Sequence, residues 1–131
     1  MERPRILLAD DHQAMLDRVS HQLAAEFDIV ATVLDGEAAI AAARELMPDA
    51  VVLDISMPRL SGLAAAKRMS AMPTPPRIVF LTVHDDPAFV AAAEDAGASG
   101  YVLKSNICTQ LITALRQALE EPTRSVRRSG G

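Results

Sequence analysis

Five residues with carboxylate, hydroxyl or ammonium side chains stand where short apolar runs of this sequence end. They are Asp10, Asp11, Asp54, Thr82 and Lys104. If the apolar runs are parallel strands, the carboxyl ends of neighbouring strands meet at one edge of the sheet. We therefore expect three carboxylates, one hydroxyl and one ammonium group to converge at that edge.

Three neighbouring carboxylates repel one another and need compensating positive charge. Lys104 supplies one unit, and Mg²⁺, which binds a few carboxylates together with waters and phosphate oxygens, would supply the rest. A carboxylate beside Mg²⁺ and a lysine is suited to accept a phosphoryl group. The motifs of other chemistries are missing. No Gly-rich phosphate-binding loop follows the first apolar run, and the Gly-x-Ser-x-Gly motif of a nucleophile elbow does not occur. A phosphatase of the Asp-x-Asp type would have a second aspartate two residues after Asp54, where this sequence has Ser56.

The elements that must position these residues alternate along the chain. The expected strands cover residues 5–9, 29–33, 50–53, 77–81 and 101–103. Apolar residues recur every four positions from Met15 to Phe27 and from Ile107 to Leu119, and three further helices are expected at 37–47, 62–72 and 87–96. Consecutive apolar residues suit strands buried on both faces. The pattern predicts the α/β class: a three-layer (βα)₅ doubly wound parallel sheet of order 2-1-3-4-5, which is flavodoxin-like.

The composition excludes several classes of protein. The chain has 131 residues, of which 50% are hydrophobic, so one domain with a real core is expected. The longest apolar runs have only six residues, too short for a membrane helix. A net charge of −4 gives no general reason to bind nucleic acid, and a single cysteine, Cys108, excludes an internal disulfide. These features predict a cytoplasmic protein.

The motifs at the expected strand ends resemble the receiver domain of two-component response regulators. The resemblance is carried by the sequences Asp-Asp-His at 10–12, Val-Val-Leu-Asp-Ile-Ser-Met-Pro at 51–58 with Ser-Gly at 61–62, Leu-Thr at 81–82, and Ala-Gly-Ala-Ser-Gly-Tyr-Val-Leu-Lys at 96–104. It covers nearly the whole chain, from about residue 5 to about residue 120. The sequences around the first and last expected strands are most similar to those of receivers of the NarL/FixJ type, which usually precede a LuxR-type helix-turn-helix domain.

The resemblance implies a phosphoacceptor and a metal site. Asp54 would be phosphorylated by a sensor histidine kinase. Asp11, Asp54 and the backbone carbonyl of Ser56 would bind Mg²⁺, with Asp10 contributing through water. The domain would catalyse only its own phosphorylation and dephosphorylation, so it would be a signalling switch and not an enzyme.

The resemblance also implies a switch. Lys104 would pair with the acyl phosphate, and the Thr82 hydroxyl would move toward it. Tyr101 would then turn inward and change the surface of the fourth helix, the fifth strand and the fifth helix. One departure from many receivers is that Ser105, and not proline, follows Lys104. Ser105 is therefore expected to begin the last helix as its N-cap.

Other residues are expected to have ordinary structural roles. Cys108 is expected in the core on the apolar side of the last helix, and His12 and His21 on the surface of the first helix. Residues 1–120 would form the receiver, and the polar tail 121–131, with three arginines, reads as a linker or frayed end.

Three hypotheses for the output stay open. A fragment of a longer transcription regulator would reach DNA only through an output domain that this sequence lacks. A stand-alone receiver would act through protein contacts, with a second copy of the chain as a candidate partner. A degenerate receiver-like dimerisation module would show neither dependence on Mg²⁺ nor a response to phosphodonors. A flavodoxin-like cofactor binder would need a phosphate loop and aromatic residues that the sequence does not show.

Overall fold

One parallel five-stranded sheet organises the computed structural model, which describes residues 2–120. The strands are β1 (Arg5–Ala9), β2 (Asp28–Val33), β3 (Ala50–Leu53), β4 (Arg77–Thr82) and β5 (Gly100–Leu103). Their order in the sheet is β2-β1-β3-β4-β5. The predicted order is therefore confirmed, whereas the predicted linker at 121–131 lies outside the described residues.

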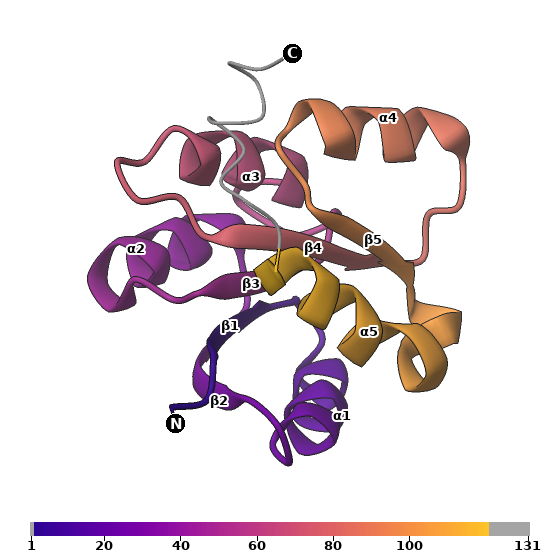
Figure 1. Ribbon diagram of the computed structural model, residues 1–131. Helices are drawn as coiled ribbons and strands as arrows, with labels where there is room; N and C mark the ends of the chain where they lie inside the picture. Colours follow the sequence, from indigo (N-terminus) through magenta and orange to yellow (C-terminus); the bar gives the residue numbers. More distant parts are fainter. Residues whose placement is uncertain (1, 121–131) are drawn as a thin grey trace.

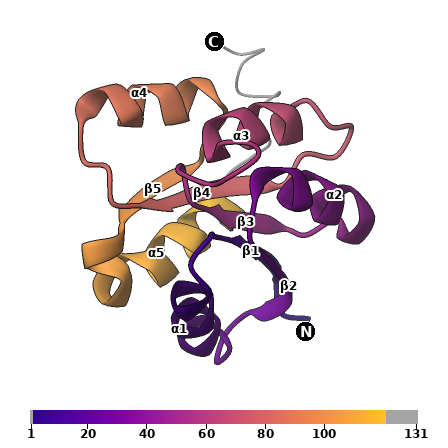
Figure 2. The same ribbon diagram turned by 180° about the vertical axis from the view of Figure 1, so that it is seen from behind.

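Helices cover both faces of this sheet. They are α1 (Gln13–Leu23), α2 (Gly36–Leu46), α3 (Gly62–Ser70), α4 (Pro87–Asp95) and α5 (Ile107–Glu120). Figure 1 shows α1 and α5 on one side of the sheet and α2, α3 and α4 on the other, and Figure 2 shows the same three layers from behind. The three-layer, doubly wound fold predicted from the alternating pattern is thus confirmed.

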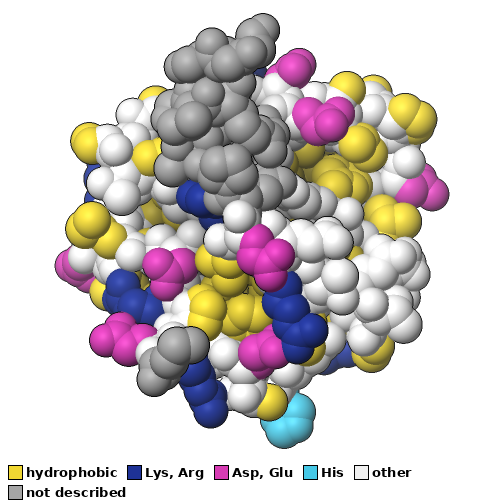
Figure 3. Space-filling view, in the orientation of Figure 1, with side chains coloured by type: hydrophobic (Ala, Val, Ile, Leu, Met, Phe, Trp, Pro, Cys, Tyr) yellow, Lys and Arg dark blue, Asp and Glu magenta, His cyan; other side chains and the backbone are white. Residues whose placement is uncertain are grey.

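Each face of the sheet has its own hydrophobic core. Alternate residues of the central strands point to opposite faces, so Leu7 packs with α2 and α3 while Leu8 packs with α1 and α5. All four residues of β3 are buried, as expected for a central strand of a parallel sheet. Within residues 2–120, no helix is long and apolar enough to cross a membrane. Figure 3 shows acidic and basic side chains interspersed on one face.

Local capping explains where three helices begin. The side chains of Asp35, Ser61 and Asp86 accept hydrogen bonds from the first turns of α2, α3 and α4. The expected ends of three helices, at residues 47, 72 and 96, are too late, because α2 ends at Leu46, α3 at Ser70 and α4 at Asp95. Residue 47 leaves the helix in a left-handed conformation, with a φ angle of 48°.

Two expectations for the last helix are wrong. A 3₁₀ turn over Lys104–Asn106 precedes α5, so Ser105 lies inside this turn and is not the N-cap of the helix. Cys108 is exposed and not part of the core. Because α5 begins at Ile107, its buried stripe runs through Ile107, Leu111 and Leu115, and the residue after Ile107 faces solvent.

Candidate functional site

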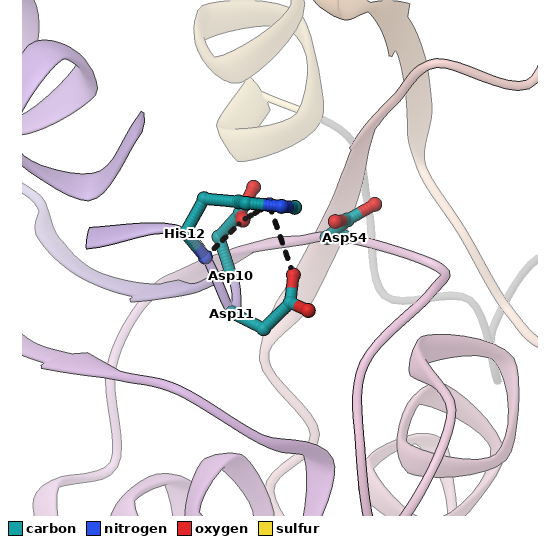
Figure 4. Close-up of side chains that lie close together, drawn as sticks. All are labelled: Asp10, Asp11, His12 and Asp54. Carbon is teal, nitrogen blue, oxygen red and sulfur yellow. Dashed lines mark hydrogen bonds and ion pairs between the residues drawn. The ribbon is translucent and has the colours of Figure 1, made fainter. Parts of the chain in front are cut away.

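Carboxylates from two central strands meet at the carboxyl edge of the sheet. Asp10 and Asp11 directly follow β1, and Asp54 directly follows β3. Figure 4 shows these side chains together with His12, and one ligand atom from each of the four lies within 4.8 Å of the others. Asp10 and Asp54 are buried, while Asp11 is exposed. The convergence of acidic groups expected from the strand ends is therefore present in the structure.

Lys104 reaches this edge from the end of β5. Its Nζ lies 2.8 Å from Oδ2 of Asp10 and 3.1 Å from Oδ2 of Asp54, and only 12% of its side chain is exposed. Burial alone would lower the pKa of this ammonium group, but its hydrogen bonds and attraction to the two carboxylates outweigh burial and raise the pKa. Lys104 therefore stays charged and holds one positive charge between the two buried acids.

Asp54 is held in a position that disfavours its own charge. Burial is the largest influence on its pKa and raises it, and the neighbouring Asp10 raises it further. Lys104 and the backbone N–H of Ser56 lower it without reversing the shift. A second cation near Asp54 would relieve this imbalance, because opposite charge stabilises the ionised form.

The loop between β3 and α3 is fixed tightly beneath the site. The backbone N–H of Gly62 donates to the carbonyl of Ile55 at 2.7 Å. A Cβ at Gly62 would lie 1.9 Å from the backbone oxygen of Asp54, so only glycine permits this approach. A Cβ at Gly36 would likewise lie 2.2 Å from the backbone oxygen of Leu60. These contacts set the path of the loop that carries Asp54 and Ser56.

Thr82 and Tyr101 are joined through His84, which lies two residues after Thr82. The hydroxyl of Thr82, which is fully buried, accepts a hydrogen bond from the backbone N–H of His84 at 3.3 Å. The Tyr101 hydroxyl donates to the backbone carbonyl of His84 at 2.6 Å. The His84 side chain lies 2.9 Å from the Ser56 hydroxyl and stacks on Phe89 of α4, with ring centroids 4.1 Å apart.

His84 thus links four parts of the molecule: the end of β4, the loop after β3, the ring on β5 and helix α4. Tyr101 itself is half-buried, and its ring lies 6.4 Å from that of Phe80. Periodicity of apolar residues carries no information about contacts between loops, so it gives no signal for this arrangement. The phosphoacceptor, metal-binding and switch roles of these residues remain predictions.

The donor set fits the divalent cation that the sequence predicts. Three carboxylates carry three negative charges, of which Lys104 balances one. A dication would balance the remaining two, and carboxylate oxygens are the ligands that Mg²⁺ prefers. The residues present therefore suit such an ion in both charge and ligand type.

The chain belongs to the response regulator receiver domain family. A five-stranded sheet of this order with an acidic carboxyl edge is the arrangement expected of that class, and the family model matches residues 6–116. The receiver domain of the response regulator NarL from Mycobacterium tuberculosis superimposes with a TM-score of 0.87 at 28% identity, covering 93% of this chain and 100% of that one. A LuxR-family response regulator from Aurantimonas sp. SI85-9A1 gives 0.85 at 32% identity, covering 90% of this chain and 86% of that one.

Curated relatives include transcriptional regulators. The transcriptional regulatory protein DegU of Brevibacillus brevis is 34% identical over 86% of this chain and 48% of its own length. The transcriptional regulatory protein YxjL of Bacillus subtilis is 38% identical over 89% of this chain and 55% of its own length. The chain thus spans about half the length of these relatives.

Proposed function

We propose that this chain is the phosphoacceptor switch of a phosphorelay, with Asp54 as the residue that receives the phosphoryl group from a sensor histidine kinase. The observation that carries the proposal is the position of Lys104, whose ammonium group bridges the buried carboxylates of Asp10 and Asp54. Charge held at the acceptor in this way stabilises the oxygens of a transferring phosphoryl group.

The transfer forms one bond and breaks another. A carboxylate oxygen of Asp54 attacks the phosphorus of a phosphohistidine, while the P–N bond breaks and its electron pair remains on the imidazole, which then takes up a proton. The Lys104 ammonium donates to the transferred group, and the Thr82 hydroxyl approaches it from the end of β4. The chain catalyses this transfer and the later hydrolysis of its own acyl phosphate, so it is a switch and not an enzyme acting on other substrates.

Mg²⁺ is the cation that we assign to this site. Asp11, Asp54 and the backbone carbonyl of Ser56 would bind the ion, with Asp10 contributing through water. When bound, the ion neutralises negative charge that builds up on the phosphoryl oxygens. The uncompensated charge of the acidic cluster and the raised pKa of Asp54 support this assignment.

The signal leaves the site through Thr82 and Tyr101. Movement of the Thr82 hydroxyl toward a phosphoryl group breaks its bond with His84, whose carbonyl holds the Tyr101 hydroxyl. Tyr101 then turns inward, and the surface formed by α4, β5 and α5 changes. Phosphorylation adds charge and acceptor oxygens that favour one of the two arrangements.

The output that we propose is control of transcription in the cytoplasm, through a DNA-binding part of a longer protein. The transcriptional regulators among the relatives, which are about twice as long as the matched segment, support this proposal. A second copy of the chain is a further candidate partner.

Intact mass measurement tests the phosphoacceptor. After incubation with a small-molecule phosphodonor and Mg²⁺, we expect one added phosphate on the wild type and none on Asp54→Asn. Asp28→Asn, an exposed residue at the start of β2, is the matched control and should be phosphorylated like the wild type. A phosphate on Asp54→Asn would place the acceptor elsewhere. No adduct on folded wild type would favour an interaction module that works without phosphorylation.

A further inference from the structure

The ring of His84 lies between the loop that follows β3 and the first turn of α4. Its Nε2 atom is 2.9 Å from the hydroxyl of Ser56. The ring also stacks on that of Phe89, with centroids 4.1 Å apart and planes 15° apart. Ser56 follows Asp54 by two residues, and Phe89 lies in the first turn of α4. One side chain therefore touches both the loop of the candidate site and this helix.

Helix α4 is attached to the rest of the molecule at few points. Of the residues of α4, all of which the structure describes, Ala93 alone is buried. The end of the helix is held by α3, because the Ser70 hydroxyl donates to the carbonyl of Ala96 at 2.9 Å. Near its start, the half-buried Phe89 packs against the core on this face of the sheet. The contact between Phe89 and the ring of His84 is therefore well placed to fix the first turn of α4.

The backbone of His84 is bonded to both residues of the proposed switch. Its N–H donates to the Thr82 hydroxyl at 3.3 Å, and its carbonyl accepts from the Tyr101 hydroxyl at 2.6 Å. When the Thr82 hydroxyl moves toward a phosphoryl group, the N–H of His84 loses this partner. A shift of His84 then disturbs the contacts of its ring with Ser56 and Phe89, because a hydrogen bond and a stacked pair both depend on distance and orientation.

We propose that His84 is a positioning residue that connects the loop after β3 to α4 by a second route, which runs from Ser56 through the imidazole ring to Phe89. The inference rests on the proposed phosphoacceptor switch and extends it, because the resemblance assigns the signal to Thr82 and Tyr101 alone. In the unphosphorylated protein, the ring holds the first turn of α4 to this loop. Phosphorylation releases the ring, so α4 responds even where the Tyr101 hydroxyl takes no part.

Amide hydrogen exchange of α4 tests the link in the intact, unphosphorylated chain, without phosphodonor or divalent cation. Ser56→Ala removes the hydroxyl and keeps the backbone carbonyl, and we expect it to speed exchange in the first turn of α4 at least about threefold, because a stabilising hydrogen bond is lost. Thr113→Ala, which removes an exposed hydroxyl from α5, is the matched control and should leave α4 as in the wild type. His84→Phe keeps a ring that can stack on Phe89 but loses the bond to Ser56, so adding Ser56→Ala to it should change nothing.

NMR amide shifts of α4, recorded with a small-molecule phosphodonor and Mg²⁺, test whether the signal uses this route. Tyr101→Phe lacks the hydroxyl that binds the carbonyl of His84, and we expect its α4 amide shifts still to change on phosphorylation. Tyr101→Phe combined with His84→Phe should lose this change while it still takes up phosphate, as intact mass measures. Tyr101→Phe combined with Thr113→Ala is the control and should keep the change.

Three outcomes would overturn the inference. The first is that Ser56→Ala leaves the exchange of α4 unchanged, or speeds it equally in the wild type and in His84→Phe. The second is that Tyr101→Phe alone abolishes the change in α4 shifts, since Tyr101 would then be the sole route. The third is that the change persists in the combined Tyr101→Phe and His84→Phe protein. If the wild type takes up no phosphate, the proposed function fails, whereas the exchange experiment still decides whether His84 holds α4 to the loop.

Discussion

Asp54 shows how a single residue can serve chemistry at the expense of stability. Burial and Asp10 raise its pKa, so the folded protein holds the carboxyl proton more tightly than the unfolded chain does. The resulting stability is present below the ordinary pKa of 3.8 and is lost as the pH rises through the folded-state pKa. At neutral pH, the ionised form that the proposed phosphorylation requires therefore lowers the stability of the fold.

Replacement of this charge by a neutral side chain of the same shape should stabilise the metal-free protein. We expect Asp54→Asn to have a higher free energy of unfolding than the wild type in urea denaturation at neutral pH without divalent cations. Asp28→Asn, on the exposed start of β2, should stay within about 0.5 kcal/mol of the wild type. Added Mg²⁺ should stabilise the wild type more than Asp54→Asn. A less stable Asp54→Asn would mean that its pairing with Lys104 outweighs burial.

Tyr101 offers a second test of a single group, because it is the only tyrosine and the chain has no tryptophan. Burial raises its pKa above the ordinary value of 10.0, and Asp85 and Asp86 raise it further. Tyr101 therefore contributes stability below pH 10.0, and this contribution is lost as the pH rises through the folded-state pKa.

Ultraviolet absorbance of the phenolate measures the pKa of Tyr101 directly, because the chain has no other tyrosine and no tryptophan. We expect the midpoint in the folded protein to lie above the midpoint in denaturant, and Asp85→Asn to lower it. Asp86 is left unchanged because its side chain caps α4. Coincident midpoints in the folded and unfolded protein would show that the hydroxyl is not held by the fold.

At the scale of elements, glycine determines how closely the start of α3 approaches the backbone that follows β3. We expect Gly62→Ala to lower the free energy of unfolding by about 1–3 kcal/mol, because its methyl group would meet the backbone of Asp54 and Ile55. Gly100→Ala is the control, since its nearest neighbour is a side-chain methyl of Val79 at 3.3 Å. Its cost should stay below about 1 kcal/mol in the same urea denaturation. If both substitutions lowered the free energy of unfolding equally, the loop between β3 and α3 would move to make room for the methyl group.

The elements also show what the sequence predicts well and what it does not. Strand order and the meeting of the acidic strand ends follow from two things: apolar runs, which depend on residue type, and right-handed crossovers, which are common to parallel sheets. Exact helix ends depend on caps and turns. Phe27 continued the predicted stripe of the first helix, yet α1 ends at Leu23, and Phe27 is buried in the turn that follows. The position of His84 depends on contacts between loops, and the exposure of Cys108 depends on the residue at which α5 begins. Periodicity predicts neither of them.

Across the whole molecule, the carboxyl edge and the opposite edge of the sheet carry different kinds of charged groups. The carboxyl edge gathers like charges that disfavour folding. At the opposite edge, arginines neutralise helix C-termini: Arg3 donates to the carbonyl of Ala24 after α1, and Arg77 donates to that of Ala118 in α5. Arg5 donates to the last carbonyls of α2. Hydrogen bonds from arginines to helix C-termini thus lie at the edge opposite the candidate site.

We therefore expect substitutions at the two edges to have different effects. A substitution at the arginine edge should change the free energy of unfolding but not the phosphorylation. Arg5 donates through Nη1 to the carbonyls of Leu46 at 2.6 Å and Met47 at 3.2 Å, and these bonds involve a charged donor. We therefore expect Arg5→Ala to lower the free energy of unfolding by about 1–2 kcal/mol in urea denaturation. Arg18→Ala, an exposed position on α1, should change it by less than about 0.5 kcal/mol.

Phosphorylation provides the other half of this test. Arg5→Ala should take up phosphate from a small-molecule donor at the wild-type rate under conditions where it is fully folded, because the substitution leaves Asp54, Lys104 and the acidic cluster unchanged. Asp54→Asn should show the opposite pattern, with greater stability in metal-free buffer and no phosphorylation. If Arg5→Ala slowed phosphorylation of the folded protein, the two edges would be coupled through the sheet, because β1, which begins at Arg5, ends directly before Asp10.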